Sequence, residues 1–330
     1  MKVSVVMTTY NGENYVYEQL RSIYQQTRKP DEVLICDDCS TDKTTLIIQD
    51  FIQNKKLDNW RLTVNSENKG WQKNFVDTLR EADGEYVFFS DQDDIWYNDK
   101  IEAMLNVMQK HPEILCLSGK MTTIDGNGDV FLGRNIFSNQ NNTNHLDKCE
   151  FSLNFNTAIM QGCTMCIARK LADMIALIGI NDFAHDVQAC RLGILMEGTY
   201  IFDRPVIYYR LHDNNTSGVV ADINFGSSNL QNRMDSINGS IIWLERLSEV
   251  SKSQNLLDTE KIAAVQNTIS FQKLRAQFLS DKNIIALIKL LKYRKYYTGF
   301  SMYVGDFSYA FHINKITGKI LWYMKKLIKI

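Results

Sequence analysis

The sequence lacks an excess of charge of either sign, and it lacks a long apolar run. Its 330 residues carry 37 Lys and Arg against 38 Asp and Glu, which gives a formal net charge of −1. Without a net positive charge the chain as a whole does not attract polyanions, so we expect no nucleic-acid partner. No window approaches ~18 uninterrupted apolar residues, and we therefore expect no segment that spans a bilayer.

A secretory leader is also lacking from the pattern at the start of the sequence. Residues 1–6 enter a strand-like run at once, without a charged stretch followed by a long apolar core. Seven cysteines without such a leader favour the reducing cytoplasm as the location. The pairs Cys36/Cys39 and Cys163/Cys166 have zinc-ligand spacing, but they lie far apart in the sequence, so we interpret them as buried or incidental thiols.

What is present is an alternation of strand and helix patterns. Apolar strand-like runs cover residues 3–7, 32–36, 61–65 and 86–89, each followed by a polar loop and a helical stretch. Four such units predict a parallel, right-handed βαβ sheet and hence an α/β fold. Pro30 is expected to end the first helix, and Ser40 or Thr41 to cap the second.

The later part of the sequence changes character. A strand pair is expected over residues 121–130 around the turn 125–128, then a mobile loop over 133–145. Strands are expected again at residues 165–168, 201–202 and 206–209. Beyond residue 220 long amphipathic helices dominate, so we predict two domains, 1–220 and 221–330.

The most informative run is Ser90–Trp96, which places Asp91, Asp93 and Asp94 directly after an apolar strand. Open α/β sheets bind ligands at the carboxyl ends of their strands. Carboxylate oxygens there suit Mg²⁺ or Mn²⁺, which takes its remaining ligands from substrate phosphates. The alternative is an acidic turn that caps a helix starting near Asn98.

Polar residues also follow the other three strands, and they should converge at the same sheet edge. The residues concerned are Thr9, Tyr10 and Asn11 after the first strand, Asp37 and Asp38 after the second, and Asn68 and Gly70 after the third.

These four motifs in this order, with Asn74 after the third, resemble family 2 glycosyltransferases of the GT-A fold. The resemblance is specific over residues 1–100 and looser to residue 218. It implies a Rossmann-like nucleotide-binding mixed sheet flanked by helices, followed here by a C-terminal helical region. It also implies an inverting, metal-dependent enzyme that moves a sugar from a nucleotide-diphosphate donor to a hydroxyl of a glycan or lipid-linked glycan acceptor.

The resemblance implies residue roles as well. Asp91, Asp93 and His212 would hold Mn²⁺ or Mg²⁺, and Asp186, in the pair His185-Asp186, would be the general base. Trp96 would either stack near the donor or lie in the core. The residues expected to contact the nucleotide or donor sugar are Thr9, Tyr10, Asn11, Asp37, Asp38, Asn68, Gly70, Asn74, Asp91, Gln92, Asp94 and Arg210. Which of Asp37 and Asp38 contacts the base stays open.

Within the family, the motifs look most like bacterial enzymes that build rhamnose-containing cell-surface polysaccharides. This favours dTDP-L-rhamnose as donor, with UDP-glucose or UDP-galactose as the rival. A nucleotidyltransferase would show a glycine-rich basic loop, whereas residues 9–13 offer one glycine and no lysine. A non-catalytic sugar-binding protein would be expected to have lost Asp93 or Asp186.

The C-terminal segment carries a charge that the overall balance conceals. Residues 282–330 contain ten Lys and Arg and one acid, Asp306, a local charge of +9. Aromatic and aliphatic residues alternate with these cations, which favours an anionic membrane surface, and hence a peripheral position on the inner face of the membrane. A solvated helical face or a homo-oligomer contact is the alternative.

Overall fold

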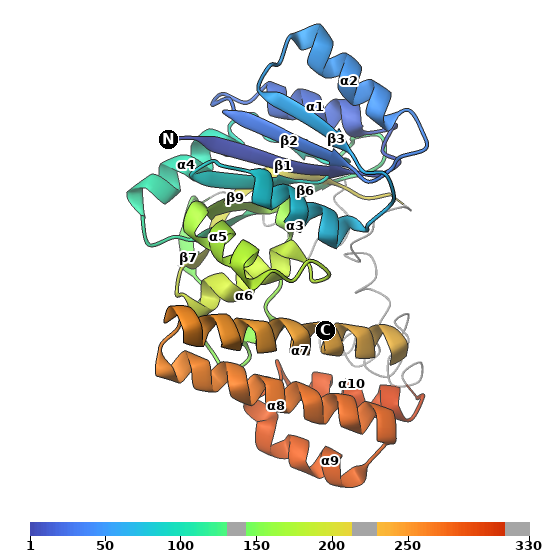
Figure 1. Ribbon diagram of the computed structural model, residues 1–330, viewed down its shortest axis with the longest axis vertical. Helices are drawn as coiled ribbons and strands as arrows, with labels where there is room; N and C mark the ends of the chain where they lie inside the picture. Colours follow the sequence, from blue (N-terminus) through green and yellow to red (C-terminus); the bar gives the residue numbers. More distant parts are fainter. Residues whose placement is uncertain (131–142, 213–229, 314–330) are drawn as a thin grey trace, which may run out of the picture. The chain divides into compact units, whose positions relative to one another are not determined.

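The computed structural model describes residues 1–130, 143–212 and 230–313 (Figure 1). The chain forms two compact units, Met1–Phe151 with Ala158–Asp213, and Ser152–Thr157 with Asn214–Ile330. The predicted boundary at residue 220 lies outside the described residues. The grouping of Ser152–Thr157 with the C-terminal helices is one that no sequence pattern indicated.

One mixed sheet forms the centre of the first unit. Its order among the described residues is β3-β2-β1-β4-β8-β6-β9-β5, with β7 beside β9. The strands are β1 Val3–Thr9, β2 Glu32–Asp37, β3 Trp60–Val64, β4 Tyr86–Ser90, β5 Ile95–Trp96, β6 Cys116–Ile124, β7 Leu146–Lys148, β8 Met165–Ala168 and β9 Thr199–Arg210. The first four pair in parallel, and β8 runs antiparallel to both β4 and β6.

The strand order contains a topological switch point. The chain moves outward from β1 to β2 and β3, and then returns to β4 on the other side of β1. Open α/β sheets bind ligands at such a point, so we expect the ligand crevice at the carboxyl ends of β1 and β4. The acidic run Asp91–Asp94 begins directly after β4, at this position.

Helices cover both faces of the sheet (Figure 1). On one face lie α1 Val16–Tyr24 and α2 Thr44–Lys55, and on the other α3 Trp71–Glu81, α5 Arg169–Ile178 and α6 His185–Leu195. The remaining helix of this unit, α4 Lys100–Lys110, follows β5, and short 3₁₀ turns occupy Phe155–Thr157 and Gly162–Thr164. Because both faces are covered, β1 is buried along its whole length, which agrees with its near-continuous apolar run over residues 3–7.

Several local predictions are wrong. The first helix ends at Tyr24, well before Pro30, and α2 begins at Thr44, so neither Ser40 nor Thr41 caps it. Asp42 Oδ1 accepts from Thr44 N instead. The strand pair over 121–130 is one strand, β6, and a single bridge between Ile124 and Val130, while the two strands predicted within 201–209 are the single strand β9.

The second unit is helical, as predicted. It contains α7 Leu230–Gln254, α8 Thr259–Asp281, α9 Ile284–Leu290, a 3₁₀ segment Leu291–Tyr296 and α10 Phe300–Ala310. Its apolar core includes Phe271, Phe278, Leu290, Tyr297 and Tyr309. Parts of the basic C-terminal segment are therefore structural core.

A buried ionic network ties these helices together around Asp306, which is fully buried. Its carboxylate accepts hydrogen bonds from Arg233 of α7, Arg275 of α8 and the Tyr297 hydroxyl. The two arginines hold the pKa of Asp306 below its usual value despite burial. The lone acid of the basic segment is thus the centre of this unit.

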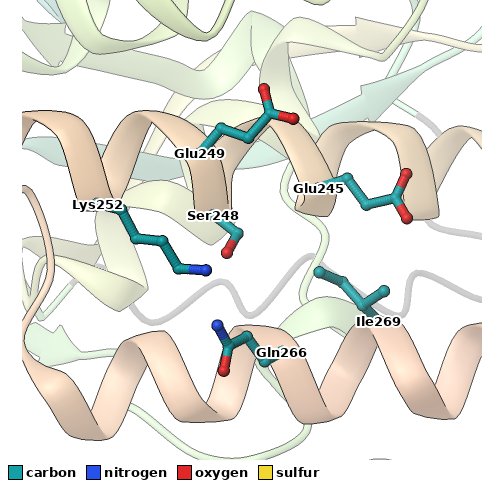
Figure 2. Close-up of a pocket in the computed structure, with 6 residues that line it drawn as sticks. All are labelled: Glu245, Ser248, Glu249, Lys252, Gln266 and Ile269. Carbon is teal, nitrogen blue, oxygen red and sulfur yellow. The ribbon is translucent and has the colours of Figure 1, made fainter.

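An open groove runs between α7 and α8 (Figure 2). The groove is lined by Glu245, Ser248, Glu249, Lys252, Gln266 and Ile269, a set that is mixed in charge. None of the predicted site residues is among them.

Within the described residues, no helix is both long and apolar enough to cross a bilayer. The loop predicted over 133–145 falls mostly outside the described residues, as does the basic aromatic run 322–327.

Candidate functional site

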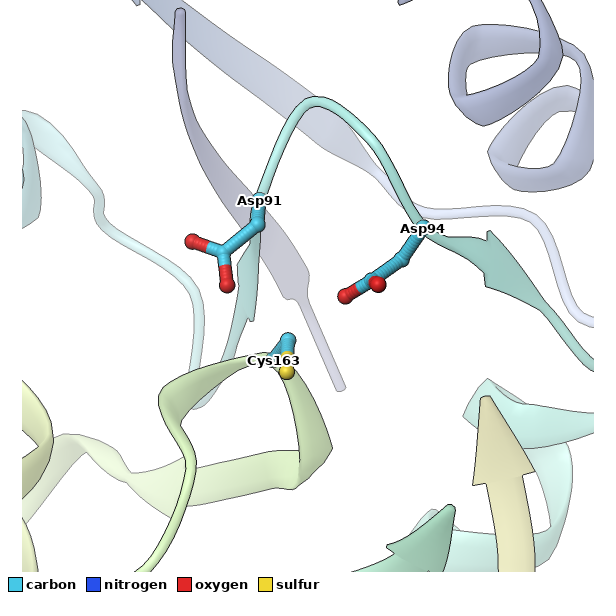
Figure 3. Close-up of side chains that lie close together, drawn as sticks. All are labelled: Asp91, Asp94 and Cys163. Carbon is cyan, nitrogen blue, oxygen red and sulfur yellow. The ribbon is translucent and has the colours of Figure 1, made fainter. Parts of the chain in front are cut away.

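The acidic loop between β4 and β5 directs two carboxylates toward one thiol (Figure 3). Oxygens of Asp91 and Asp94 and the Sγ of Cys163 all lie within 4.8 Å of one another. Cys163 comes from the 3₁₀ turn before β8, the strand that pairs with β4. The pairing of β4 with β8 therefore brings this turn to the acidic loop.

Crowding of negative charge perturbs these carboxyls. Burial and the neighbouring Asp93 and Asp186 charges raise the pKa of Asp91 to about 7. Burial, with the charges of Asp93 and Asp91, raises the pKa of Asp94 well above its usual value. Asp94 Oδ2 has no hydrogen-bond donor among the described residues apart from the weakly donating Cys163 thiol. Against these negative charges the charge of Lys100 acts in the opposite direction and compensates them only in part.

Asp93 points to a different partner. Its Oδ2 lies 2.8 Å from His212 Nε2, and the His212 ring stacks on Tyr15 with ring centroids 4.8 Å apart. Two of the three residues expected to hold the metal ion, Asp93 and His212, are therefore side-chain neighbours, and their role as ligands stays a prediction.

Arg210 holds the acidic loop in place. Its Nε donates to Asp93 O at 2.9 Å, its Nη1 to Gly126 O at 3.0 Å, and its Nη2 to Glu18 Oε2 at 2.5 Å. The side chain is only 1% exposed. The expected contact between Arg210 and the donor phosphates stays a prediction, since its guanidinium is already engaged by the protein.

Lys100 is a site residue that the sequence analysis missed. Its ammonium is buried, donates to Cys163 O at 2.6 Å and lies 3.7 Å from the centre of the Trp96 ring. Burial lowers the pKa of Lys100 to about 7, against the opposing charges of Asp94 and Asp91. Lys100 thus links the start of α4 to the turn that carries Cys163.

Asp186 lies in the first turn of α6. Its Oδ2 accepts from Gly162 N at 3.3 Å, in the turn that contains Cys163, and its Oδ1 accepts from Val187 N at 2.7 Å. The hydrogen bond to Gly162 places the predicted base against the turn whose Cys163 contacts the acidic cluster, and the charge of Asp186 contributes to the raised pKa of Asp91.

His185 has a different environment from its neighbour. Its ring stacks on Phe75 with centroids 3.9 Å apart and packs against Phe89, and neither nitrogen has a hydrogen-bond partner among the described residues. Burial lowers the pKa of His185 to about 4. A Cβ at Gly162 would collide with its Nε2, so glycine permits this close packing.

The loop after β1 is fastened to the acidic loop. Gln92 Oε1 accepts from Tyr10 N at 2.8 Å and its Nε2 donates to Tyr10 O at 3.0 Å. A Cβ at Gly12 would overlap the Gln92 amide, so a larger residue there would have to displace this side chain. The Tyr10 side chain is 46% exposed, so its ring is free to meet a ligand.

The loop after β2 is fastened to the loop after β1. Buried Asp37 accepts from Thr9 Oγ1 at 2.7 Å and from Ser40 N at 2.8 Å. Asn11 Oδ1 accepts from Thr41 N at 2.9 Å. These hydrogen bonds hold the two loops together at the strand ends where the crevice is expected, and contact of these residues with a nucleotide stays a prediction.

Asp38 fixes the loop after β3. Its carboxylate accepts from Lys69 N, Gly70 N and Asn65 Nδ2, each at 2.9 Å. It does not cap the next helix, which begins at Thr44. Asn68 Oδ1 closes a tight turn by accepting from Gly70 N, and buried Asn74 donates to Cys36 O.

Two minor expectations are decided by these contacts. Trp96 is 1% exposed, so it lies in the core as the alternative interpretation held. The four Cys-x-x-Cys thiols do not form a ligand group in the described residues, where the one candidate group joins Cys163 to two carboxylates.

The residues present fit a divalent cation. Clustered carboxylates, an unpaired buried carboxylate oxygen at Asp94 and an imidazole 2.8 Å from Asp93 are the features such an ion would satisfy. The thiol is the poorest match, because burial and nearby carboxylates raise the pKa of Cys163 well above its usual value and keep it protonated.

The chain was compared with known proteins. Residues 4–175 match the family described as "Glycosyl transferase family 2". The sheet combines four parallel strands with a mixed continuation, and an acidic loop follows β4 at the switch point, which is the architecture of a GT-A fold. The chain belongs to glycosyl transferase family 2 and is a glycosyltransferase.

The chain is similar to two glycosyltransferases over stretches of different length. The chain is 29% identical over 317 residues to "dTDP-rhamnosyl transferase RfbG" of Shigella flexneri, covering 86% of this chain and 99% of that protein. It is 31% identical over 128 residues to "UDP-Glc:alpha-D-GlcNAc-diphosphoundecaprenol beta-1,3-glucosyltransferase WfgD" of Escherichia coli, covering 39% of this chain and 49% of that protein.

Among solved structures, the fold is similar to that of Staphylococcus aureus TarS residues 1–349 in complex with UDP-GlcNAc. The TM-score is 0.55 at 19% identity, with 88% of this chain and 79% of that chain covered. This likeness supports the GT-A fold. Family membership replaces the nucleotidyltransferase and the non-catalytic sugar-binding protein as interpretations.

Proposed function

We propose that this protein is an inverting, metal-dependent glycosyltransferase that extends a bacterial cell-surface polysaccharide or lipid-linked glycan. The observation that carries the proposal is geometric: Asp186 Oδ2 accepts from Gly162 N at 3.3 Å, and the next residue, Cys163, has its Sγ within 4.8 Å of oxygens of Asp91 and Asp94. An acceptor base beside a cation-binding cluster is the arrangement that direct displacement of a nucleoside diphosphate requires.

In this proposal each carboxylate has one task. Asp91 and Asp93, with His212, hold Mn²⁺ or Mg²⁺, and Asp94 accepts from Arg210 N at 3.1 Å, which fixes the acidic loop. The ion supplies charge neutralisation to the diphosphate. Asp186 takes the proton of the acceptor hydroxyl, whose oxygen bonds to the anomeric carbon as the nucleoside diphosphate departs from the opposite face with inversion.

The donor proposed is dTDP-L-rhamnose. The similarity to RfbG, which extends over nearly the whole of that protein, supports it. UDP-glucose or UDP-galactose is the second candidate, favoured by the similarity to WfgD over a shorter stretch. The donor base would stack on the exposed ring of Tyr10, near the loop that Asp38 fixes. A cytoplasmic location belongs to the same proposal, supported by seven cysteines that are all free thiols.

The test is release of nucleoside diphosphate from a panel of dTDP-L-rhamnose, UDP-glucose, UDP-galactose and UDP-GlcNAc, with Mn²⁺, Mg²⁺ or EDTA. We expect turnover of dTDP-L-rhamnose with a divalent ion and none in EDTA. Asp93→Asn should abolish turnover, because it removes charge from the cation-binding cluster. Asp186→Asn should bind donor nearly normally and lose at least ~10²-fold in transfer rate, the usual scale for a positioned base.

Asp182→Asn is the matched control, since Asp182 is exposed and lies four residues before Asp186, in the bend that precedes α6. It should retain full activity. Full activity in excess EDTA would contradict the metal assignment, and transfer by Asp186→Asn at the wild-type rate would place the base elsewhere. Preference for a UDP-hexose would replace rhamnose as the donor.

A further inference from the structure

The surface of α9 presents apolar side chains to solvent. Ile284, Ile285, Ile288 and Leu291 are between 53% and 64% exposed. Their spacing of one, four and seven residues places them on one helical face, while Ala286 and Leu290 on the other face are buried in the helical core. Contiguous apolar patches of this kind on a protein surface mark interaction sites.

Positive charge surrounds this patch. Five exposed cations lie between residues 282 and 296, and this stretch contains no Asp or Glu: Lys282, Lys289, Lys292, Arg294 and Lys295. None of the five forms an ion pair within the part of the chain that the structure describes, although the same unit pairs other cations, such as Lys273 with Glu245. The partner of this face must therefore supply both apolar contact and negative charge.

We propose that the α9 face docks on an anionic lipid surface. The four aliphatic side chains would enter the boundary between headgroups and acyl chains, and the five cations would contact lipid phosphates and carboxylates. A second copy of the chain fits less well, because pairing two α9 faces would bring two clusters of five positive charges together.

The proposed contact surface is smaller than the whole basic segment 282–330 that the sequence pointed to. Of the basic segment 282–330, Tyr297, Asp306 and Tyr309 are committed to the core of the helical unit. The contact is thus assigned to the exposed face of α9 and the turn after it. It is independent of the donor chemistry, and would hold the enzyme near a lipid-linked acceptor.

The test is co-sedimentation of the full chain with vesicles of phosphatidylglycerol and phosphatidylcholine, compared with phosphatidylcholine alone, in the absence of substrate. We expect binding to the anionic vesicles that weakens as salt rises. The double variant Ile285→Ser with Ile288→Ser should lose binding at least tenfold. Its control is Ile242→Ser, because Ile242 lies on α7 of the same unit and is 55% exposed.

A second variant tests the contribution of positive charge to vesicle binding. Neutralising Lys289, Lys292 and Lys295 to Gln should weaken binding by about a hundredfold, at roughly fivefold per cation near an anionic surface. Neutralising the exposed Lys55, Lys56 and Lys110 of the other unit should change it little.

Two results would overturn the proposal. Equal binding by the Ile285/Ile288 double variant and the intact chain would remove α9 from the contact. A concentration-dependent dimer in light scattering that the same double variant abolishes would assign the face to a second copy. Donor hydrolysis, measured in parallel without vesicles, should be unchanged in these variants, so failure here leaves the catalytic proposal standing.

Discussion

Lys100 shows how a single buried charge can organise a catalytic loop. It is the one cation whose ammonium both contacts the Cys163 turn and opposes the charges of Asp91 and Asp94 in the described part of the chain. We predict that Lys100→Met destabilises the protein by about 1–3 kcal/mol, because Cys163 O is left without a donor. The same change should shift the acidic limb of the kcat/KM profile to higher pH.

The direction of that shift follows from charge. The Lys100 charge lowers the pKa of Asp91, so its removal raises that pKa, and the carboxylate becomes ionised only at higher pH. Lys100→Arg keeps the charge, so the acidic limb of its kcat/KM profile should lie closer to that of the wild-type protein than the limb of Lys100→Met does. Lys110→Met, at the exposed end of the same helix, is the control. An unmoved pH profile in Lys100→Met would reduce Lys100 to a packing role.

The sequence contained a signal for Lys100 that was not used. Lys100 shares a helical face with Ile101, Met104, Leu105 and Met108, all buried, so a cation interrupts an apolar face. Because fully buried lysines are rare unless they are paired, a lysine on such a face indicates a position with a specific partner. The structural role of Arg210 could not be predicted in this way. Its partners Glu18 and Gly126 are distant in the sequence and meet it only in the folded chain.

At the scale of elements, the four strand–helix units at the start of the chain could be predicted from the sequence. The later strands of the sheet could be predicted only in part. The first four strands are short apolar runs between turn signals, which local pattern describes well. Strand β9 was predicted in two pieces because Asp203, Arg204 and Pro205 interrupt its apolar run. In the folded chain Lys120 pairs with Asp203, and register shifts on both sides of Lys120 accommodate the interruption. Tertiary pairing thus overrides the local pattern.

The helical unit carries a second prediction at this scale. Asp306→Asn should lower its free energy of unfolding by about 3–5 kcal/mol, because Arg275, only 4% exposed, would be left buried without a counter-charge. Hydrogen exchange of amides in α8 and α10 measures this loss locally. Asp281→Asn, at the exposed end of α8, should leave protection unchanged.

The same ionic network predicts a response to acid. The folded-state pKa of Asp306 is below its unfolded value, so its stabilisation is fully present above the unfolded value of ~3.9 and is lost as pH falls through the folded value. Amide protection in α8 and α10 should therefore fall below about pH 4 in the wild-type chain, and Asp306→Asn should remove this part of the pH dependence. An identical acid response in both proteins would argue against the network as its origin.

At the scale of the whole molecule, the basic C-terminal segment cannot be treated as a removable appendage. The sequence alone favoured a membrane-surface contact for this segment, with a solvated helical face or a homo-oligomer contact as the alternative. Burial of Leu290, Tyr297 and Tyr309 against Phe271 and Phe278 shows that part of the segment is core. Local charge and periodicity identified the segment as unusual, but long-range contacts, which no local pattern encodes, decide which of its faces are core.

We therefore predict that a chain ending at residue 281 loses the structure of α7 and α8 and keeps nucleotide binding. Truncation removes Asp306, leaving Arg275 unpaired, and strips apolar cover from Phe271 and Phe278, where the loss of each large core side chain costs about 2–5 kcal/mol. The residues of the acidic loop, Lys100 and Asp186 all belong to the other unit, so the crevice should form without the helices. Hydrogen exchange across α7 and α8, together with calorimetric titration of nucleoside diphosphate and Mn²⁺, measures both outcomes on one sample. Full amide protection in the truncated chain would show that α7 and α8 fold as a pair without α9 and α10, whereas loss of nucleotide binding would show that the catalytic unit depends on the helical one.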